Sequence, residues 1–418
     1  MKKSLCLFTL AFALLFCMSV KVNAETITTW NDLKTCLTAS GTATCETEGA
    51  ITATEKVDVV GDKTLILGDT LTISQRIKIG NGAKLVVKGN ITAERHIFFA
   101  VEGATLKLEE GTFKSLSRTS AAYGIYIYGG ATPDADKINI NIGKDAKIED
   151  AGIAIFSADV GIANAYGITI DVYGSISMTK SATSTYHTFT TNGEITAKTG
   201  ENLPVINFYS GSSVTNEEAP AIYAAGYAIW NIEGGTFKGS EALSIKSGKF
   251  NITGGTFVAD GEYVKPEDVQ TQGSASEDTG AAISITGNDG YAAGVEMNIE
   301  NAIVESKNGY AIFEGITKGV TPAVKEMVIT SGEYTGKISA VYAENAEGFI
   351  EGGEFNGEVD EKFVSEDLET KVIDGVTYVG ESIPEVPNTG DNVVLFVILG
   401  LMSLVAFGYA SNKLRKNA

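Results

Sequence analysis

A repeat with a period of 20 residues constrains this chain more than any other feature of its sequence. The segments I-W-N-I-E-G-G-T-F and K-F-N-I-T-G-G-T-F follow one another between Ile229 and Phe257, so Trp230 and Phe237 recur as Phe250 and Phe257. Apolar residues at alternate positions, closed by Gly-Gly turns, are typical of short strands. A unit this short cannot bury its own apolar face and must be covered by a copy of itself. The repeat therefore predicts a β-solenoid.

Related signals extend this pattern over most of the chain. Similar endings occur at Gly111-Thr112-Phe113, Ser331-Gly332-Glu333-Tyr334 and Gly352-Gly353-Glu354-Phe355. A small residue followed by an aliphatic one also recurs once per unit, and Ala282, Ala311 and Ala340 are spaced 29 residues apart. In the endings, glycine permits a tight corner and the aromatic ring can stack on its equivalents inside the coil. Strands are therefore expected from Ile51 to Gly357.

The periodicity resembles the right-handed parallel β-helix of pectate-lyase-like proteins and of many bacterial surface proteins. The resemblance covers about Ile51 to Gly380 and implies an all-β, right-handed parallel β-helix over residues 51–380. The strand rhythm stops in the charged stretch Glu358–Glu369 and returns at Lys371–Val379, so these segments are expected to cap its carboxyl end. A shared fold of this kind predicts architecture and not activity.

The amino end has the layout of a secretory signal peptide. Met1-Lys2-Lys3 is basic, Leu5 to Val20 is apolar, and Val22-Asn23-Ala24 offers small residues for cleavage before Glu25. The apolar stretch is short for a membrane span. We therefore expect residues 1–24 to be removed during export, with the cut between Ala24 and Glu25.

Residues 25–50 are expected to form an amino-terminal cap. Export leaves Cys36 and Cys45 as the only cysteines, which predicts a disulfide between them. Thr29 to Asp32 resembles a capping box that opens a short amphipathic helix. The apolar residues at helical spacing are Trp30, Leu33 and Leu37. Such a helix would cover the open edge and apolar core of the first coil.

The carboxyl end combines a short motif, an apolar run and a basic tail. Residues 381–390 are a polar linker that ends in Val386-Pro387-Asn388-Thr389-Gly390. Val393 to Ala410 is an apolar run of 18 residues, which predicts a transmembrane helix and cytoplasmic tail over residues 391–418. The basic residues of the tail are Lys413, Arg415 and Lys416.

This order is similar to the cell-wall sorting signal of Gram-positive surface proteins, whose pentapeptide is Leu-Pro-any-Thr-Gly. Val386 stands where that family has leucine. The resemblance implies that a sortase cysteine attacks the Thr389 carbonyl, releases Gly390 onward and transfers the acyl group to a peptidoglycan-precursor amine. Sortase and that precursor are therefore the expected partners, and the cell wall is the expected location. An ordinary single-pass anchor would display the same domain without cleavage.

Charge argues against a nucleic-acid partner. The formal net charge is −20, and it becomes −25 once both end segments are left out. A surface of this sign repels phosphate backbones.

Catalytic residues, metal ligands and cofactor motifs are not recognisable in the sequence. Arginine occurs at Arg76, Arg95, Arg118 and Arg415, and histidine at His96 and His187. Polysaccharide lyases on this fold commonly need a basic residue with calcium-binding carboxylates, and no such cluster is evident. Candidate carboxylate pairs for glycoside hydrolysis are Asp134 with Asp136 and Glu217 with Glu218.

The sequence thus favours a wall-anchored β-helical protein that is not an enzyme and presents an adhesive face to a glycan or a host protein. A sugar-stacking strip could be formed by Tyr209, Tyr223, Tyr227 and Tyr310, although packing in the core or in turns is the favoured explanation of these tyrosines. A polysaccharide-degrading enzyme on the same scaffold and a structural coat protein are the alternatives. Converging carboxylates would favour the enzyme, and a flat face with an aromatic ladder would favour adhesion.

Overall fold

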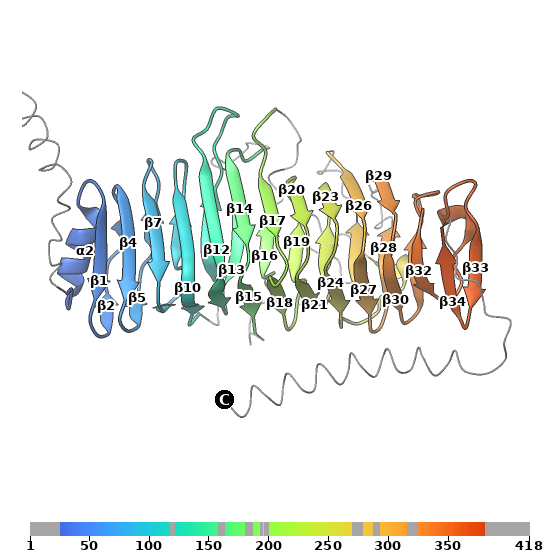
Figure 1. The fold of residues 1–418 in the computed structure, drawn as a ribbon, viewed down its shortest axis with the longest axis horizontal. Helices are drawn as coiled ribbons and strands as arrows, with labels where there is room; N and C mark the ends of the chain where they lie inside the picture. The colour runs from blue at the N-terminus through green and yellow to red at the C-terminus, as the bar shows by residue number, and fades with distance from the viewer. Residues whose placement is uncertain are drawn as a thin grey trace, which may run out of the picture. The chain divides into compact units, whose positions relative to one another are not determined.

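The computed structural model describes residues 26–117, 122–157, 164–179, 187–192, 195, 200–269, 279–286, 293–315 and 324–380. Successive coils of short strands stack in chain order, as the colours of Figure 1 show. In the described residues, the strands form a 23-stranded and an 11-stranded sheet, and the coils pair in parallel. The prediction of an all-β solenoid with parallel sheets is therefore confirmed.

Each coil has three faces. The first face contains β1 (Ala43–Thr47), β4 (Asp62–Leu67), β7 (Lys84–Lys88), β14 (Ile168–Val172), β17 (Val205–Phe208), β20 (Ile229–Ile232), β23 (Gly248–Ile252), β26 (Val295–Ile299) and β29 (Val324–Ile329). The second contains β2 (Ile51–Ala53), β5 (Leu71–Ile73), β8 (Ile91–Ala93), β15 (Ser175–Met178), β18 (Ser213–Asn216), β21 (Thr236–Gly239), β24 (Thr256–Ala259), β27 (Ala302–Ser306), β30 (Gly332–Gly336) and β32 (Gly353–Asn356). Two long strands, β10 (Thr105–Ser115) and β12 (Ile138–Glu149), run through both faces and join them into the larger sheet.

The third face is the 11-stranded sheet. It consists of β3 (Val57–Asp58), β6 (Ile77–Ile79), β9 (Phe98–Ala100), β11 (Tyr123–Tyr128), β13 (Gly152–Phe156), β16 (Phe189–Thr191), β19 (Ile222–Ala224), β22 (Leu243–Ile245), β25 (Ile283–Thr286), β28 (Tyr310–Gly315) and β31 (Ser339–Ala343). A 3-10 helix, η1 (Pro266–Asp268), lies in the connection between β24 and β25.

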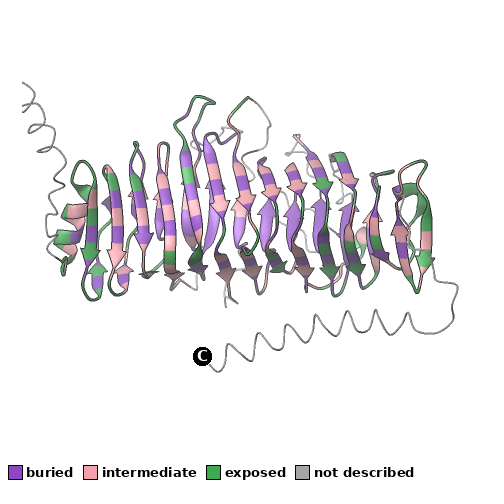
Figure 2. Cartoon of the chain, viewed as in Figure 1, coloured by how far each residue is buried: buried purple, intermediate pink, exposed green. Residues whose placement is uncertain are grey.

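The core follows from the alternation of side chains along each strand. Buried and half-buried or exposed positions alternate in most strands of the first two faces, which gives the striped ribbons of Figure 2. Equivalent residues of successive coils stack inside: the Trp230 and Phe250 rings lie 5.7 Å apart at 4°, and those of Phe237 and Phe257 lie 4.9 Å apart at 11°. The 20-residue repeat is therefore a repeat of core contacts.

Two single glycines with positive φ test the coil spacing. Gly111 has a φ of 111°, and a Cβ added to it would lie 2.0 Å from the carbonyl oxygen of Gly89 in the preceding coil. Gly211 has a φ of 89° with nothing within 4 Å of an added Cβ. Both alanine variants strain the backbone, but only Gly111→Ala also forces two coils apart. We expect Gly111→Ala to lower the free energy of unfolding by about 1–3 kcal/mol more than Gly211→Ala, measured by chemical denaturation. Equal losses would contradict this spacing.

A helix covers the amino end of the solenoid. The helix α2 (Trp30–Thr38) begins after Thr29, whose hydroxyl oxygen accepts a hydrogen bond from the Asp32 backbone N–H at 3.3 Å. Leu33 and Leu37 are fully buried in the apolar core, and the helix contacts β1, β2 and β3. The expected amphipathic cap is therefore present, although the first coil already begins with β1, inside the segment 25–50 that the sequence assigns to the cap.

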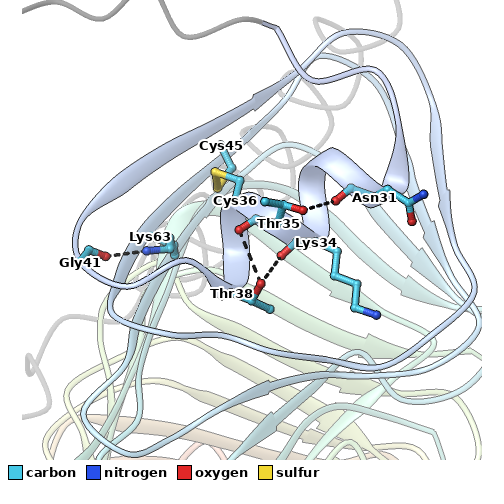
Figure 3. Close-up of a disulfide and its surroundings, with 8 residues drawn as sticks. All are labelled: Asn31, Lys34, Thr35, Cys36, Thr38, Gly41, Cys45 and Lys63. Carbon is cyan, nitrogen blue, oxygen red and sulfur yellow. Dashed lines mark hydrogen bonds between the residues drawn. A yellow bond between two sulfur atoms is a disulfide. The ribbon is translucent and has the colours of Figure 1, made fainter.

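Two further links fasten this cap to the coils. Cys36 and Cys45 form a disulfide with their Cα atoms 5.9 Å apart, which ties the helix to β1 (Figure 3). The buried Lys63 ammonium on β4 donates a hydrogen bond to the Gly41 carbonyl at 2.5 Å. The loop between α2 and β1 is thus fixed by the disulfide that joins the two elements and by the hydrogen bond from Lys63.

Antiparallel pairing closes the carboxyl end. After η2 (Glu361–Phe363), the strands β33 (Thr370–Ile373) and β34 (Val376–Val379) form a hairpin, and β34 also pairs antiparallel with β32. The hairpin occupies the edge of the last coil where a further parallel strand would otherwise add. This agrees with the cap expected from the break in strand rhythm.

Candidate functional site

The third face carries a set of aromatic rings on its outer side. In β9, β11 and β13 the isoleucines, Phe98 and Ala100 point into the core, whereas four aromatic side chains are half-buried on the outside: Phe99, Tyr126, Tyr128 and Phe156. The parallel register places Phe99 beside Tyr126, and Tyr128 beside Phe156. We call these four residues the outer aromatic ladder.

The rings of the ladder form one continuous surface across three coils. The ring centroids of Phe99 and Tyr126 are 5.4 Å apart at 10°, and those of Tyr126 and Phe156 are 4.4 Å apart at 14°. Tyr128 packs obliquely against all three at 5.2 to 5.9 Å. Mutual packing fixes the orientation of these rings, so the surface is pre-formed.

His96 borders the ladder as a neutral side chain. Its Nδ1 accepts a hydrogen bond from the Tyr123 backbone N–H at 3.2 Å, and its ring stacks on that of Tyr123 at 5.7 Å. Burial, with smaller contributions from the positive charges of Arg95 and Arg76, lowers the pKa of His96 to about 4. A proton is therefore held on Nε2 at neutral pH, where it is a hydrogen-bond donor.

A guanidinium group lies over the Phe99 ring of the ladder. The Arg76 side chain is exposed, and its Cζ lies 4.7 Å from the centroid of the Phe99 ring. Within the described part of the chain, this guanidinium makes no hydrogen bond or ion pair, so its N–H groups face solvent above an aromatic surface.

A cavity of about 420 Å³ lies at the corner that follows β18, β21 and β24 in three successive coils. Its acidic lining residues are Glu217, Glu218, Glu241, Asp260 and Glu262. Some of these carboxylates have structural partners, since Glu241 accepts from the Thr279 backbone N–H at 2.9 Å and Asp260 lies 3.0 Å from the Lys238 ammonium. In the described residues, no group of three or more His, Cys, Asp or Glu side chains is arranged to hold a metal ion.

The carboxylates singled out in the sequence fall in different places. Glu217 and Glu218 do line this cavity, together with acids that no local motif connects to them. Asp134 and Asp136 lie in the loop after β11, where the Asp136 backbone N–H donates to a Glu102 carboxylate oxygen at 3.0 Å. They are not among the residues that line the cavity.

The tyrosines of the suggested strip do not form one exposed surface. Tyr223, Tyr227 and Tyr310 are buried, with exposed fractions of 5%, 1% and 8%. His187 covers Tyr223 at a ring distance of 4.4 Å, and Tyr310 packs against Phe313 and Tyr342. Tyr209 alone is half-buried, stacked on Tyr173 at 4.2 Å and 2°. The four tyrosines therefore do not form a sugar-stacking strip, and the outer aromatic ladder is the exposed aromatic surface considered below.

A row of amides on the first face was not predicted. Asn207 donates to Asp171, Asn231 to Asn207 and Asn251 to Asn231, each through Nδ2 at 2.8 Å. The signal was present, because asparagine has the same place in I-N-F, W-N-I and F-N-I. These amides bond to one another along the coil axis, so their role is to tie neighbouring coils together.

The half-buried His187 gives the fold a pH dependence with a defined sign. Burial lowers the pKa of His187 to about 4 from an ordinary value near 6.5. Between these values the unfolded chain binds a proton that the folded chain does not, so the free energy of unfolding falls as the pH falls. The free energy of unfolding is expected to fall between about pH 7 and pH 4.5, and we expect this fall to be about 2 kcal/mol smaller in His187→Asn. Denaturation at both pH values measures it. Identical losses in both proteins would contradict this assignment.

The end segments lie outside the described residues. This applies to Ala24 and Glu25 at the cleavage site and to Val386, Pro387, Asn388, Thr389 and Gly390 of the sorting motif. None of the helices in the described ranges has the length and apolarity needed to span a membrane.

No family model, curated protein or solved structure matches this chain.

Proposed function

We propose that this chain is exported and displayed on a Gram-positive cell surface, where its solenoid binds glycans through the outer aromatic ladder. In this proposal the coils are right-handed, the hand that parallel crossovers adopt in nearly all sheets. Residues 1–24 are the signal peptide, and residues 391–418 hold the chain in the membrane until sortase joins Thr389 to the peptidoglycan precursor.

The stacked rings of Phe99, Tyr126 and Phe156 on the outside of the solenoid are the observation that supports binding. The rings of Trp230 and Phe250, by contrast, point inward and pack in the core. The ladder instead leaves the edges of a rigid, half-buried ring stack in contact with solvent. Tyrosine provides contact area at a low cost in conformational entropy, and a sugar can pack its C–H groups against the exposed ring edges.

The acidic cavity supports a second candidate, a glycoside hydrolase. Hydrolysis of this kind needs two carboxyl groups on either side of a bound sugar, and the cavity brings acids from three coils together. We rank it second because at least Glu241 and Asp260 hold structural hydrogen bonds or ion pairs.

A glycan array probed with the full-length protein in detergent tests both candidates. The binding proposal expects retention of specific glycans, with their masses unchanged in mass spectra taken afterwards. Release of shortened oligosaccharides would favour the hydrolase, and a Glu217→Gln variant would then be expected to lose that release. If the array shows no retained glycan and no released oligosaccharide, both candidates are overturned.

A further inference from the structure

Arginines border the outer aromatic ladder, and the strands that carry it have no acidic side chain, as is the case for most strands of the third face. The protein has a net charge of −20, yet β9, β11, β13 and β16 contain no acidic residue. Two of the four arginines of the sequence, Arg76 and Arg95, lie at its edge, and both charges act on His96. The ladder is therefore an uncharged surface bordered by guanidinium groups in an acidic protein.

Arg76 is placed to receive an anion. Its guanidinium is held over Phe99 at 4.7 Å, and its hydrogen-bonding groups are not used by the described residues. The parallel register places Lys78 of β6 beside Phe99 of β9, so a second cation lies next to the ladder. On its other side, Lys78 is paired in register with Asp58 of β3. A planar guanidinium binds carboxylate or sulfate oxygens through two parallel hydrogen bonds, and stacking on a ring reduces its freedom beforehand.

We propose that the ligand of the ladder is an anionic glycan, with its C–H groups against the outer edges of the Tyr126 and Phe156 rings and a carboxylate or sulfate on Arg76. This inference rests on the proposed glycan-binding function and adds the class of ligand. It also gives a reason for the arginines: a neutral glycan would need the rings alone, whereas an acidic one must overcome repulsion by the rest of the protein.

Matched glycan pairs test the proposal on the full-length protein at physiological ionic strength. The pairs are sialylated and desialylated lactosamine, hyaluronan and carboxyl-reduced hyaluronan oligosaccharides, and sulfated and desulfated chondroitin oligosaccharides. We expect the acidic member of at least one pair to bind about tenfold more tightly or better, and Arg76→Gln to remove about tenfold of that affinity. The same variant should weaken binding of the neutral member less than binding of the acidic member.

Lys144→Gln is the matched control, because it removes one positive charge from a side chain that is 84% exposed on β12. If both variants weakened binding of the acidic glycan equally, net charge alone would explain the effect, and the proposal would be overturned. Equal binding of acidic and neutral members would overturn it as well, while leaving the proposed glycan-binding function intact. Binding of no member of any pair, together with an empty glycan array, would overturn the proposed function and this inference with it.

Discussion

Replacing Trp230 by alanine is expected to lower the free energy of unfolding by about 3–5 kcal/mol. The side chain is fully buried, and its ring is parallel to those of Phe208 and Phe250, at 6.4 and 5.7 Å, with Phe189 packed edge-on at 5.4 Å. Alanine would leave a cavity in the middle of an aromatic column. Because each coil contacts only its neighbours, no distant part of the solenoid can compensate. Denaturant titration of the purified variant measures the loss.

Two further variants separate the loss of buried ring volume from the loss of the indole N–H and from the loss of an exposed ring. The Trp230 Nε1–H has no hydrogen-bond partner in the described residues, so Trp230→Phe keeps a stacked ring and removes an unsatisfied donor. We expect it to cost at most about 1 kcal/mol. Tyr173→Ala removes an outer ring that is 36% exposed and should cost about 1 kcal/mol or less. If Trp230→Ala were no more costly than Tyr173→Ala, the inner column would not be the source of stability.

Thr389→Ala is expected to abolish covalent attachment to the cell wall. In the sortase reaction that the sorting motif implies, the Thr389 carbonyl is the acyl donor, and the enzyme must recognise this threonine to cut after it. The variant should remain with the membrane and be extracted by detergent, whereas the unchanged protein should be released only by digestion of the wall. Fractionation of cells followed by immunoblotting distinguishes the two.

Asn388→Ala is the control for this experiment, since it changes the position at which the motif accepts any residue. It should remain attached to the wall. Unchanged covalent attachment of Thr389→Ala would contradict the role of Thr389, and loss of attachment in both variants would point to a damaged chain rather than to loss of threonine recognition.

The inside of the solenoid was predictable because its contacts repeat in the sequence. A period of 20 residues places Trp230 on Phe250 and Phe237 on Phe257, and both stacks are present. The capping helix was predictable for a local reason, because Thr29 and the spacing of Leu33 and Leu37 lie within one short segment.

The outside was harder to predict because it depends on loop lengths. Phe99, Tyr126 and Phe156 are 27 and 30 residues apart, so no fixed period connects them. The acidic cavity has the same origin, since its residues come from three coils whose register only the folded chain defines. Alternation did carry a partial signal: in Gly124-Ile125-Tyr126-Ile127-Tyr128 the isoleucines point inward and the tyrosines outward.

The most direct test of the central claim removes the ladder without touching the core. The double variant Phe99→Ser, Tyr126→Ser deletes two outer rings, and Tyr173→Ser, Tyr209→Ser deletes an equally well stacked outer pair on the first face. Both should keep the circular dichroism spectrum of the unchanged protein. We predict that retention on the glycan array falls about tenfold or more in the first variant and is unaffected in the second. Equal retention by the two variants would contradict the assignment of the outer aromatic ladder as the binding surface.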